Sequence, residues 1–255
     1  MGDAMSLGAL SERRGASRQV AIRLTAGFQI TIAGRPVGLP HSVERLLALL
    51  ALSDRPMHRV KVAGTLWIDA TDSQAASNLR TALWRLHRAE SEVVVTEADR
   101  VALGPDVWVD YGRLVGIAHH LIDLSDIDSF DHVTELIDAG DLLPDWDDDW
   151  VVADRERLRL LRLEALERAA LQLLGRGQHG YALRAALGAS RSEPLRESAR
   201  RLLIQVHLAE GNVAEALLAY RDYRETLMDE IGIEPSAAME ALVGPLVSRS
   251  TVTRA

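Results

Sequence analysis

The sequence predicts a mainly α-helical protein with a small β content, in which a part that mixes strands and helices precedes an all-helical part. Two observations predict this class. Short strand-like runs occur only before residue 108, whereas apolar residues three and four positions apart recur along the rest of the chain. The chain has 255 residues, of which 47% are hydrophobic and 26% charged, so it can form two globular domains.

The mixed part begins with strands. Residues 1–19 have no apolar core of the signal-peptide type, and we expect them to form a flexible tail. Residues 20–24 and 28–32 are strand-like, and the turn-rich segment 34–40 can include a third strand.

Three amphipathic helices and a hairpin are expected next. The helices span residues 42–53, 59–67 and 73–90, and Ser42 is the expected N-cap of the first. The runs EVVVT and VALG then predict a β-hairpin whose loop is residues 97–100. This order predicts a winged helix-turn-helix, in which the third helix enters the DNA major groove and the hairpin is the wing.

From Trp108 onward the pattern predicts only helices. They are expected at residues 111–122, 126–139, 154–174, 178–190, 194–210, 213–231 and 236–247. The segments that begin at Gly177 and Gly211 resemble each other at an offset of 34 residues, the tetratricopeptide period. Each glycine is expected to end one helix and let the next fold back. We therefore expect a winged-helix domain at 20–107, a tetratricopeptide-like helical domain at 108–247 and a tail at 248–255.

Charge is unevenly distributed along the chain. The net charge of −8 divides into +2 over residues 1–115 and −10 over residues 116–255, which predicts two domains with different partners. The sequence contains no cysteine, which excludes disulfides and thiolate metal sites and is consistent with the cytoplasmic location that we expect. It also lacks an apolar run of about 18 residues, so no membrane span is expected.

The helix at residues 73–90 has one face that core packing does not explain. At 100° per residue, one side carries the apolar residues Leu79, Ala82, Leu83 and Leu86. The opposite side and its flanks carry Ser77, Arg80, Thr81, Trp84, Arg85 and Arg88. Arginine bonds guanine edges or phosphates, and Asn78, like serine and threonine, is a shorter donor to base edges. A tryptophan beside three arginines favours DNA contact over a merely salt-bridged surface, which is the alternative for this face.

Three further cations are candidates for phosphate contacts. Arg59 and Lys61 begin the second helix, where they can meet phosphates together with the N-terminal amides. Arg100 is expected in the hairpin loop, where a wing meets the minor groove or a phosphate. Glu97 and Asp99 share that loop and would repel DNA.

Other polar clusters favour structural roles. The stretch DWDDDW at 145–150 lacks the spacing of an EF-hand, and we expect Trp146 and Trp150 to pack in the core. His119 and His120 are adjacent and would face about 100° apart on a helix, which makes them a poor metal pair. The sequence contains none of the common catalytic or phosphate-binding motifs. We therefore expect no enzyme activity, no catalytic residues, no cofactor and no metal.

Several stretches resemble one known family. They are RLLALLAL, LW at 66–67, NLRTALWRLHR, LLPDWDDDWV, RLRLLRLEALE and the long stretch from EPLRESARRLL to GIEPS at 193–236. Over roughly residues 20–247 the chain resembles the actinobacterial antibiotic regulatory proteins (SARP family), which join an OmpR-like winged helix to a helical bacterial transcriptional activation domain.

The resemblance implies a sequence-specific transcriptional activator of secondary-metabolite genes. Its implied partners are double-stranded DNA with direct repeats near promoters, a second protomer on that DNA, and the sigma factor and alpha subunit of RNA polymerase. The recognition helix would be residues 73–90 and the wing residues 93–103. Two alternatives stay open: an adaptor that has lost DNA binding and acts through protein contacts, and a sensor with a small ligand among its helices.

Overall fold

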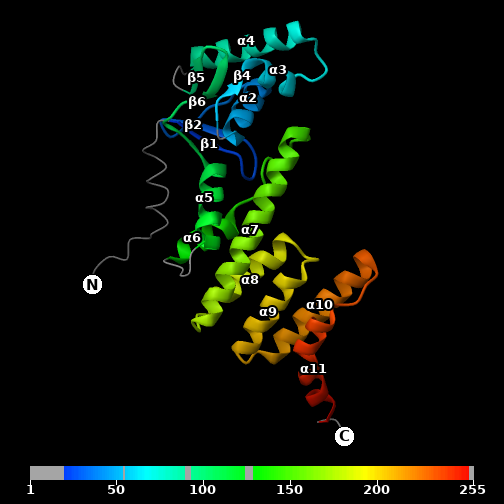
Figure 1. Cartoon of the computed structure of the whole chain (residues 1–255). Coiled ribbons are helices and arrows are strands. Elements are labelled where there is room, and N and C mark those ends of the chain that lie inside the picture. The colour runs from blue at the N-terminus through cyan, green and yellow to red at the C-terminus, as the bar shows by residue number, and fades with distance from the viewer. Residues whose placement is uncertain (1–19, 54, 90–92, 124–128, 253–255) are drawn as a thin grey trace, which may run out of the picture. The chain divides into compact units, whose positions relative to one another are not determined.

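The computed structural model of the chain describes residues 20–53, 55–89, 93–123 and 129–252. Its contacts define two compact units, whose elements are labelled in Figure 1. Unit 1 comprises Met1–Arg113 and Gly140–Leu158, and unit 2 comprises Leu114–Ala139 and Arg159–Ala255. The expected tail at 1–19 lies outside the described residues.

Unit 1 contains a four-stranded sheet in the order β3-β2-β1-β7. Its strands are β1 (Val20–Arg23), β2 (Gln29–Ile32), β3 (Arg35–Pro36) and β7 (Val107–Val109). β1 pairs antiparallel with β2, whereas β7 runs parallel to β1, with Val20 opposite Val107. The sequence analysis missed β7, so its expectation of helix alone from Trp108 onward is wrong. A three-residue strand carries almost no periodicity, and its partner strand lies far away in the sequence.

Three helices and a second sheet follow β3. The helices are α2 (His41–Leu52), α3 (Arg59–Leu66) and α4 (Asp72–Ala89). The second sheet is antiparallel in the order β4-β6-β5 and contains β4 (Met57–His58), β5 (Val94–Glu97) and β6 (Arg100–Leu103). Buried side chains of all three helices and of β6 form the core, among them Leu46, Leu50, Leu66, Leu79 and Val101. These elements form the winged helix that the sequence predicts.

Two local predictions in this unit are wrong. Ser42 is not an N-cap, because α2 begins at His41 and its first amides bond the carbonyl of Pro40 instead. The hairpin loop is also shorter than expected, since β5 ends at Glu97 and β6 begins at Arg100, directly opposite. Arg100 is therefore a strand residue beside a two-residue turn. The same hairpin sequence is compatible with a two-residue turn and with a four-residue loop, and sequence alone does not distinguish these two connections.

Residues 140–158 pack against the first sheet within unit 1. The backbone N–H of Leu143 donates to Leu24 O (2.9 Å), and Ala26 N–H donates to Asp141 O (2.8 Å). Gly140 permits this approach, because a Cβ at that position would lie 2.7 Å from the Cβ of Ala26. The Arg155 guanidinium holds the segment in place by donating to the carbonyls of Leu142, Leu143 and Trp146.

The expected structural role of the DWDDDW stretch is confirmed for Trp146, whereas Trp150, also expected in the core, is only half-buried. Trp146 is buried and stacks on Phe28 at 5.9 Å between ring centroids, with His41 against its edge. Asp148 pairs with Arg45 and accepts a hydrogen bond from the Trp150 indole. The described residues contain no cluster of acids and histidines that could hold a metal ion.

Unit 2 is helical, with α8 packed on α9 and α9 packed on α10. Its helices, some of which begin in or extend from unit 1, are α5 (Asp110–Asp123), α6 (Phe130–Asp138), α7 (Asp149–Gly175), α8 (His179–Ser192), α9 (Glu197–Ala209), α10 (Val213–Ile231) and α11 (Ala237–Val252). α11 extends into the segment 248–255 for which a tail is expected, and residues 253–255 are outside the described part. The predicted helix start at 126 also falls on residues that are not described.

The predicted helix-ending glycines are confirmed. Gly177 and Gly211 both have positive φ angles, of 70° and 78°. In both turns the following residue donates its N–H to a carbonyl five residues back, from Gln178 to Leu173 and from Asn212 to His207. The two segments of the 34-residue repeat therefore begin with the same turn geometry. Together the two units have the predicted fold class: mainly α with a small β content, a winged helix-turn-helix and a tetratricopeptide-like helical domain.

Candidate nucleic-acid interface

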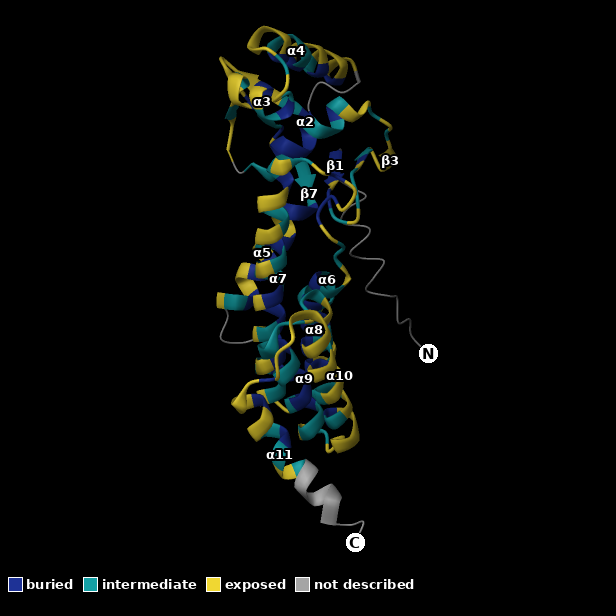
Figure 2. Cartoon of the chain, turned by 90° about the vertical axis from the view of Figure 1, so that its right-hand side faces the viewer, coloured by how far each residue is buried: buried dark blue, intermediate teal, exposed yellow. Residues whose placement is uncertain are grey.

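α4 places one face in the core of unit 1 and leaves the other face open (Figure 2). Leu79, Ala82 and Leu86 are buried, as the periodicity predicts, and α4 packs on α2 and α3. The helix begins after Thr71, whose hydroxyl accepts a weak hydrogen bond from Gln74 N–H (3.4 Å). The apolar stripe thus fixes which residues α4 presents outward.

The outward face of α4 carries the predicted side chains. Arg80, Thr81, Trp84, Arg85 and Arg88 are exposed, and Ser77 and Asn78 are half-buried. The Trp84 side chain is 58% exposed, and the Arg88 guanidinium lies over its ring at 5.0 Å. Within the described part of the chain, no acid pairs with Arg80, Arg85 or Arg88. These guanidinium groups can therefore donate to an external acceptor.

The polar residues near the start of this face have contacts within α4 itself. The Thr81 hydroxyl donates to Ser77 O (3.0 Å), and the Gln74 amide donates to Asn78 Oδ1 (3.1 Å). Thr81 keeps its oxygen lone pairs for another donor, and Asn78 keeps its amide N–H groups. Both side chains can therefore still bond base edges or phosphates.

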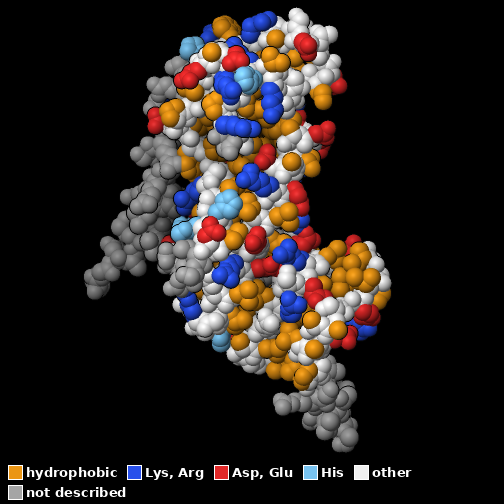
Figure 3. Space-filling view, viewed as in Figure 1, with side chains coloured by type: hydrophobic (Ala, Val, Ile, Leu, Met, Phe, Trp, Pro, Cys, Tyr) orange, Lys and Arg blue, Asp and Glu red, His pale blue; other side chains and the backbone are white. Residues whose placement is uncertain are grey.

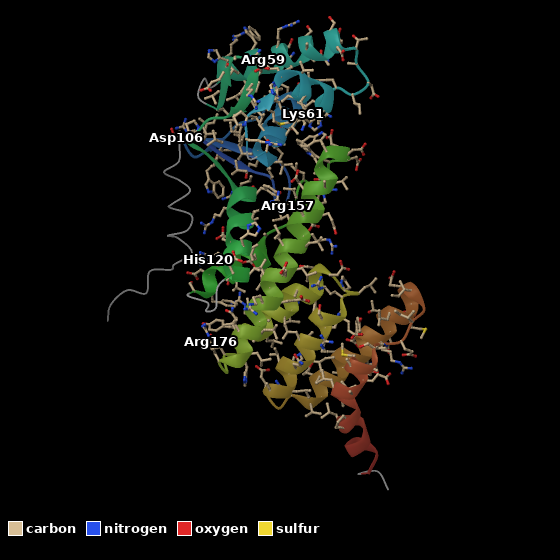
Figure 4. All side chains as sticks on the ribbon, in the orientation of Figure 1. Arg59, Lys61, Asp106, His120, Arg157 and Arg176 are labelled. Atoms are coloured by element: carbon tan, nitrogen blue, oxygen red, sulfur yellow. The ribbon has the colours of Figure 1, made fainter. Side chains whose placement is uncertain are left out.

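An open groove of about 290 Å³ runs between α4, the start of α3 and β5. Its lining residues are Arg59, Arg80, Leu83, Trp84, Leu86, His87, Val94 and Thr96. The groove brings Arg59 of α3 together with Arg80 and Trp84 of α4. Lys61 is exposed on α3 but does not line the groove; Figure 4 labels Arg59 and Lys61.

Arg100 is held by β4 and the residue before it rather than extended from a loop. Its guanidinium donates to Pro56 O (3.0 Å) and lies 2.9 Å from His58 Nε2. His58 Nδ1 lies 2.7 Å from Asp99 Oδ2, and this hydrogen bond holds the pKa of Asp99 below its ordinary value. Since arginine only donates, Nε2 of His58 accepts, and Nδ1 donates to Asp99.

The same turn contacts the start of α3. The backbone N–H of Arg59 donates to Asp99 O (2.8 Å), so one N-terminal amide that was expected to meet phosphate is already bonded. Sequence reasoning missed His58, His87 and Thr96, which link or line this surface. The alternation of side chains along β5 gives a signal for Thr96, but sequence gives none for the histidines, whose partners lie on other elements.

Figure 3 shows Lys and Arg side chains over the visible face of unit 1, interspersed with a few acids and histidines. The surface therefore combines unpaired guanidinium groups, an exposed indole and a positively lined groove. Such a surface can bond phosphates and base edges. None of the described helices has both the length and the apolar character needed to cross a membrane.

Comparison with known proteins finds a family-model match in the C-terminal part and two curated relatives. Residues 139–245 match the family model of the bacterial transcriptional activator domain. The chain is 29% identical over 214 residues to the regulatory protein AfsR of Streptomyces coelicolor and 26% identical over 213 residues to AfsR of Streptomyces griseus. Each match covers 80% of this chain and 22% of the relative, so the chain spans about a fifth of the length of these curated relatives.

A solved structure shares the fold. EmbR of Mycobacterium tuberculosis, in complex with a low-affinity phosphopeptide, superposes with a TM-score of 0.70 at 22% identity, over 91% of this chain and 66% of that one. The comparisons agree with the resemblance to the SARP family of regulatory proteins, and residues 139–245 are similar to the bacterial transcriptional activator domain.

Proposed function

We propose that the protein is a sequence-specific DNA-binding transcriptional activator. α4 enters the major groove, where Ser77, Asn78, Arg80, Thr81, Trp84, Arg85 and Arg88 contact bases and phosphates. Arg59, Lys61 and Arg100 contact the backbone at the edges of the site. The observation that carries this proposal is the outward face of α4, where Trp84 is exposed among arginines that no described acid neutralises.

Unit 2 supplies the activating function in this proposal. Two protomers occupy a direct repeat near a promoter, and the helical unit recruits RNA polymerase through its sigma factor and alpha subunit. The match of residues 139–245 to an activator domain supports this role. The curated relatives are named regulatory proteins, and we propose secondary-metabolite genes as the targets.

Selection of bound sites from random duplexes, followed by a salt titration on the selected sequence, tests the proposal. We expect enrichment of a direct repeat and a linear fall of log affinity with log salt concentration. Arg80→Ala and Arg85→Ala should each cost about 1–3 kcal/mol, or about 5- to 150-fold in affinity, if they remove a base contact. Arg35→Ala is the matched control, because Arg35 is an exposed arginine on β3, in the other sheet of unit 1.

The adaptor remains a second candidate because residues 1–115 carry a net charge of only +2, and Glu97 and Asp99 are exposed at the turn. An adaptor would show no enriched sequence and no salt-dependent binding to duplex DNA. In that case Arg80→Ala and Arg35→Ala would behave alike.

A further inference from the structure

The end of α10 exposes three large apolar side chains close together. Met228, Ile231 and Ile233 are 45%, 52% and 52% exposed. Met228 and Ile231 are three positions apart on the helix, and Ile233 follows the turn at Gly232, where φ is 71°. Figure 3 shows hydrophobic side chains gathered at this end of α10, with acidic side chains beside them. We call these three residues the α10 tip.

A left-handed helix cap accounts for only part of this arrangement. Gly232 N–H bonds the carbonyls of Leu227 and Met228, and in such caps the residue after the glycine often packs on the last turn. Packing of that kind would cover Met228 and Ile233, yet about half of each side chain stays in contact with solvent. Isolated exposed apolar residues are common, whereas a cluster of three indicates a contact surface.

The charges at the α10 tip also oppose helix stability. The last turn of α10 contains no basic residue, and Asp229 and Glu230 are exposed there. Carboxylates near a helix C-terminus face the negative end of the helix dipole, which costs stability. Within the described part of the chain, no Lys or Arg pairs with either of them. Exposure of the apolar cluster and the position of these acids both cost free energy in the unbound protein. A partner with apolar and basic side chains would cover the first and neutralise the second.

The tip is held rigidly on the protein. Arg224 donates to both carboxylate oxygens of Glu234, at 2.6 and 2.7 Å, and this lowers the pKa of Glu234. Ser236 donates its backbone N–H to Glu197 at 2.9 Å, which fixes the other end of the loop. Beneath it, Tyr223 and Leu227 belong to a buried core that α11 completes. A preorganised apolar surface loses little entropy when it binds.

We propose that the α10 tip is the docking site for a basic amphipathic segment of RNA polymerase, with an apolar stripe that covers the three side chains and Lys or Arg residues that pair with Asp229 and Glu230. This inference rests on the proposed function. Charge complementarity selects this occupant, because the acids and the helix dipole repel DNA and attract cations. The net charge of −10 over residues 116–255 attracts a basic partner at longer range.

The experiment compares two sets of variants of the full chain with the native protein. The tip variant is Ile231→Ser with Ile233→Ser, and the charge variant is Asp229→Lys with Glu230→Lys. The matched control is Val213→Ser with Leu218→Ser, which removes two partly exposed apolar side chains from the same helix, at 41% and 40% exposure. Purified bacterial RNA polymerase holoenzyme is the probe, and its binding to each variant is measured with and without the selected duplex. Far-UV circular dichroism and sedimentation are recorded for each.

We expect the tip and charge variants to lose at least about tenfold in polymerase affinity, as hot-spot residues do, and to keep their duplex affinity. The control should match the native protein in both assays. Equal polymerase binding by native and tip variants overturns the proposal, and so does a native protein that binds duplex but not polymerase. A change of the tip variant from dimer to monomer would also overturn it, because the occupant would then be a second copy. A native protein that binds polymerase but no duplex refutes the proposed function instead. The polymerase affinities of the variants would then still test the α10 tip as a docking site.

Discussion

Asp110 is expected to be one of the most sensitive positions for the stability of unit 1. The carboxylate is 7% exposed and accepts four hydrogen bonds where β7 meets α5. Oδ1 accepts from Leu24 N–H (2.9 Å) and Tyr111 N–H (2.7 Å). Oδ2 accepts from Thr25 N–H (3.0 Å) and the Thr25 hydroxyl (2.7 Å). These bonds satisfy the amides at the end of β1, which have no strand partner there.

Two substitutions of Asp110 separate the charge from the hydrogen bonds. In Asp110→Asn the side-chain oxygen can keep the two hydrogen bonds made by Oδ1. The NH₂ group replaces Oδ2, so it cannot accept from Thr25 N–H. The Thr25 hydroxyl can turn and accept from the NH₂ group instead. One bond is lost, at a cost of about 1–2 kcal/mol. Asp110→Ala loses all four bonds and leaves Leu24 N–H buried without an acceptor, at a cost of about 3–5 kcal/mol. Thr25→Val, the control, loses only the hydroxyl bond, at about 1 kcal/mol.

Urea unfolding monitored by tryptophan fluorescence measures this difference in unit 1 alone. All five tryptophans belong to unit 1: Trp67, Trp84, Trp108, Trp146 and Trp150. The free energy of unfolding should fall in the order native, Thr25→Val, Asp110→Asn, Asp110→Ala. An Asp110→Ala protein within about 1 kcal/mol of native would refute the reasoning, since a buried amide without an acceptor costs at least that much.

Two further predictions concern unit 1. The fragment 20–107 lacks Asp110 and Trp146, so it should lose the cooperative thermal transition that tryptophan fluorescence detects in the intact chain; an unchanged transition would contradict the role of residues 140–158. The folded-state pKa of Asp99 is lowered by His58, so its bond stabilises the hairpin above the ordinary value of 3.8 and this contribution is lost as the pH falls through the lower folded pKa. Amide protection in the hairpin, taken relative to the intrinsic exchange rate at each pH, should therefore fall on acidification in the native protein and not in Asp99→Asn. Equal pH dependence of protection in both would refute the assignment.

The sequence predicts the orientation of α4 because that property is local. Leu79, Ala82 and Leu86 recur at helical spacing, and all three are buried. Once they face the core, the helix geometry alone places Arg80 and Trp84 outward. The turns at Gly177 and Gly211 are predictable for the same reason, since a glycine at a helix end specifies a local backbone conformation.

The surroundings of Arg100 depend on contacts that sequence spacing does not encode. Its residue type and its place in the hairpin suggest a free cation at a wing tip. In the fold, β4 lies beside β6, which brings Pro56 and His58 to its guanidinium. The pairing of a two-residue strand with a distant one decides this outcome, and such a strand has no periodicity to reveal it.

The boundary between the two parts of the chain could not be predicted from the sequence. The activator-domain match and the compact units divide the chain at different places. The match begins at residue 139, yet Gly140–Leu158 belong to unit 1, where Trp146 stacks on Phe28 and Leu143 bonds Leu24. A chain cut or exchanged at residue 108 would thus separate the first sheet from the segment that covers it. The apolar contacts of Trp146 would be lost together with its partners, and burial of an aromatic side chain of this size contributes about 3–5 kcal/mol. It follows that the winged helix depends for its stability on residues that sequence comparison assigns to the activator domain, so the two are not independent folding units.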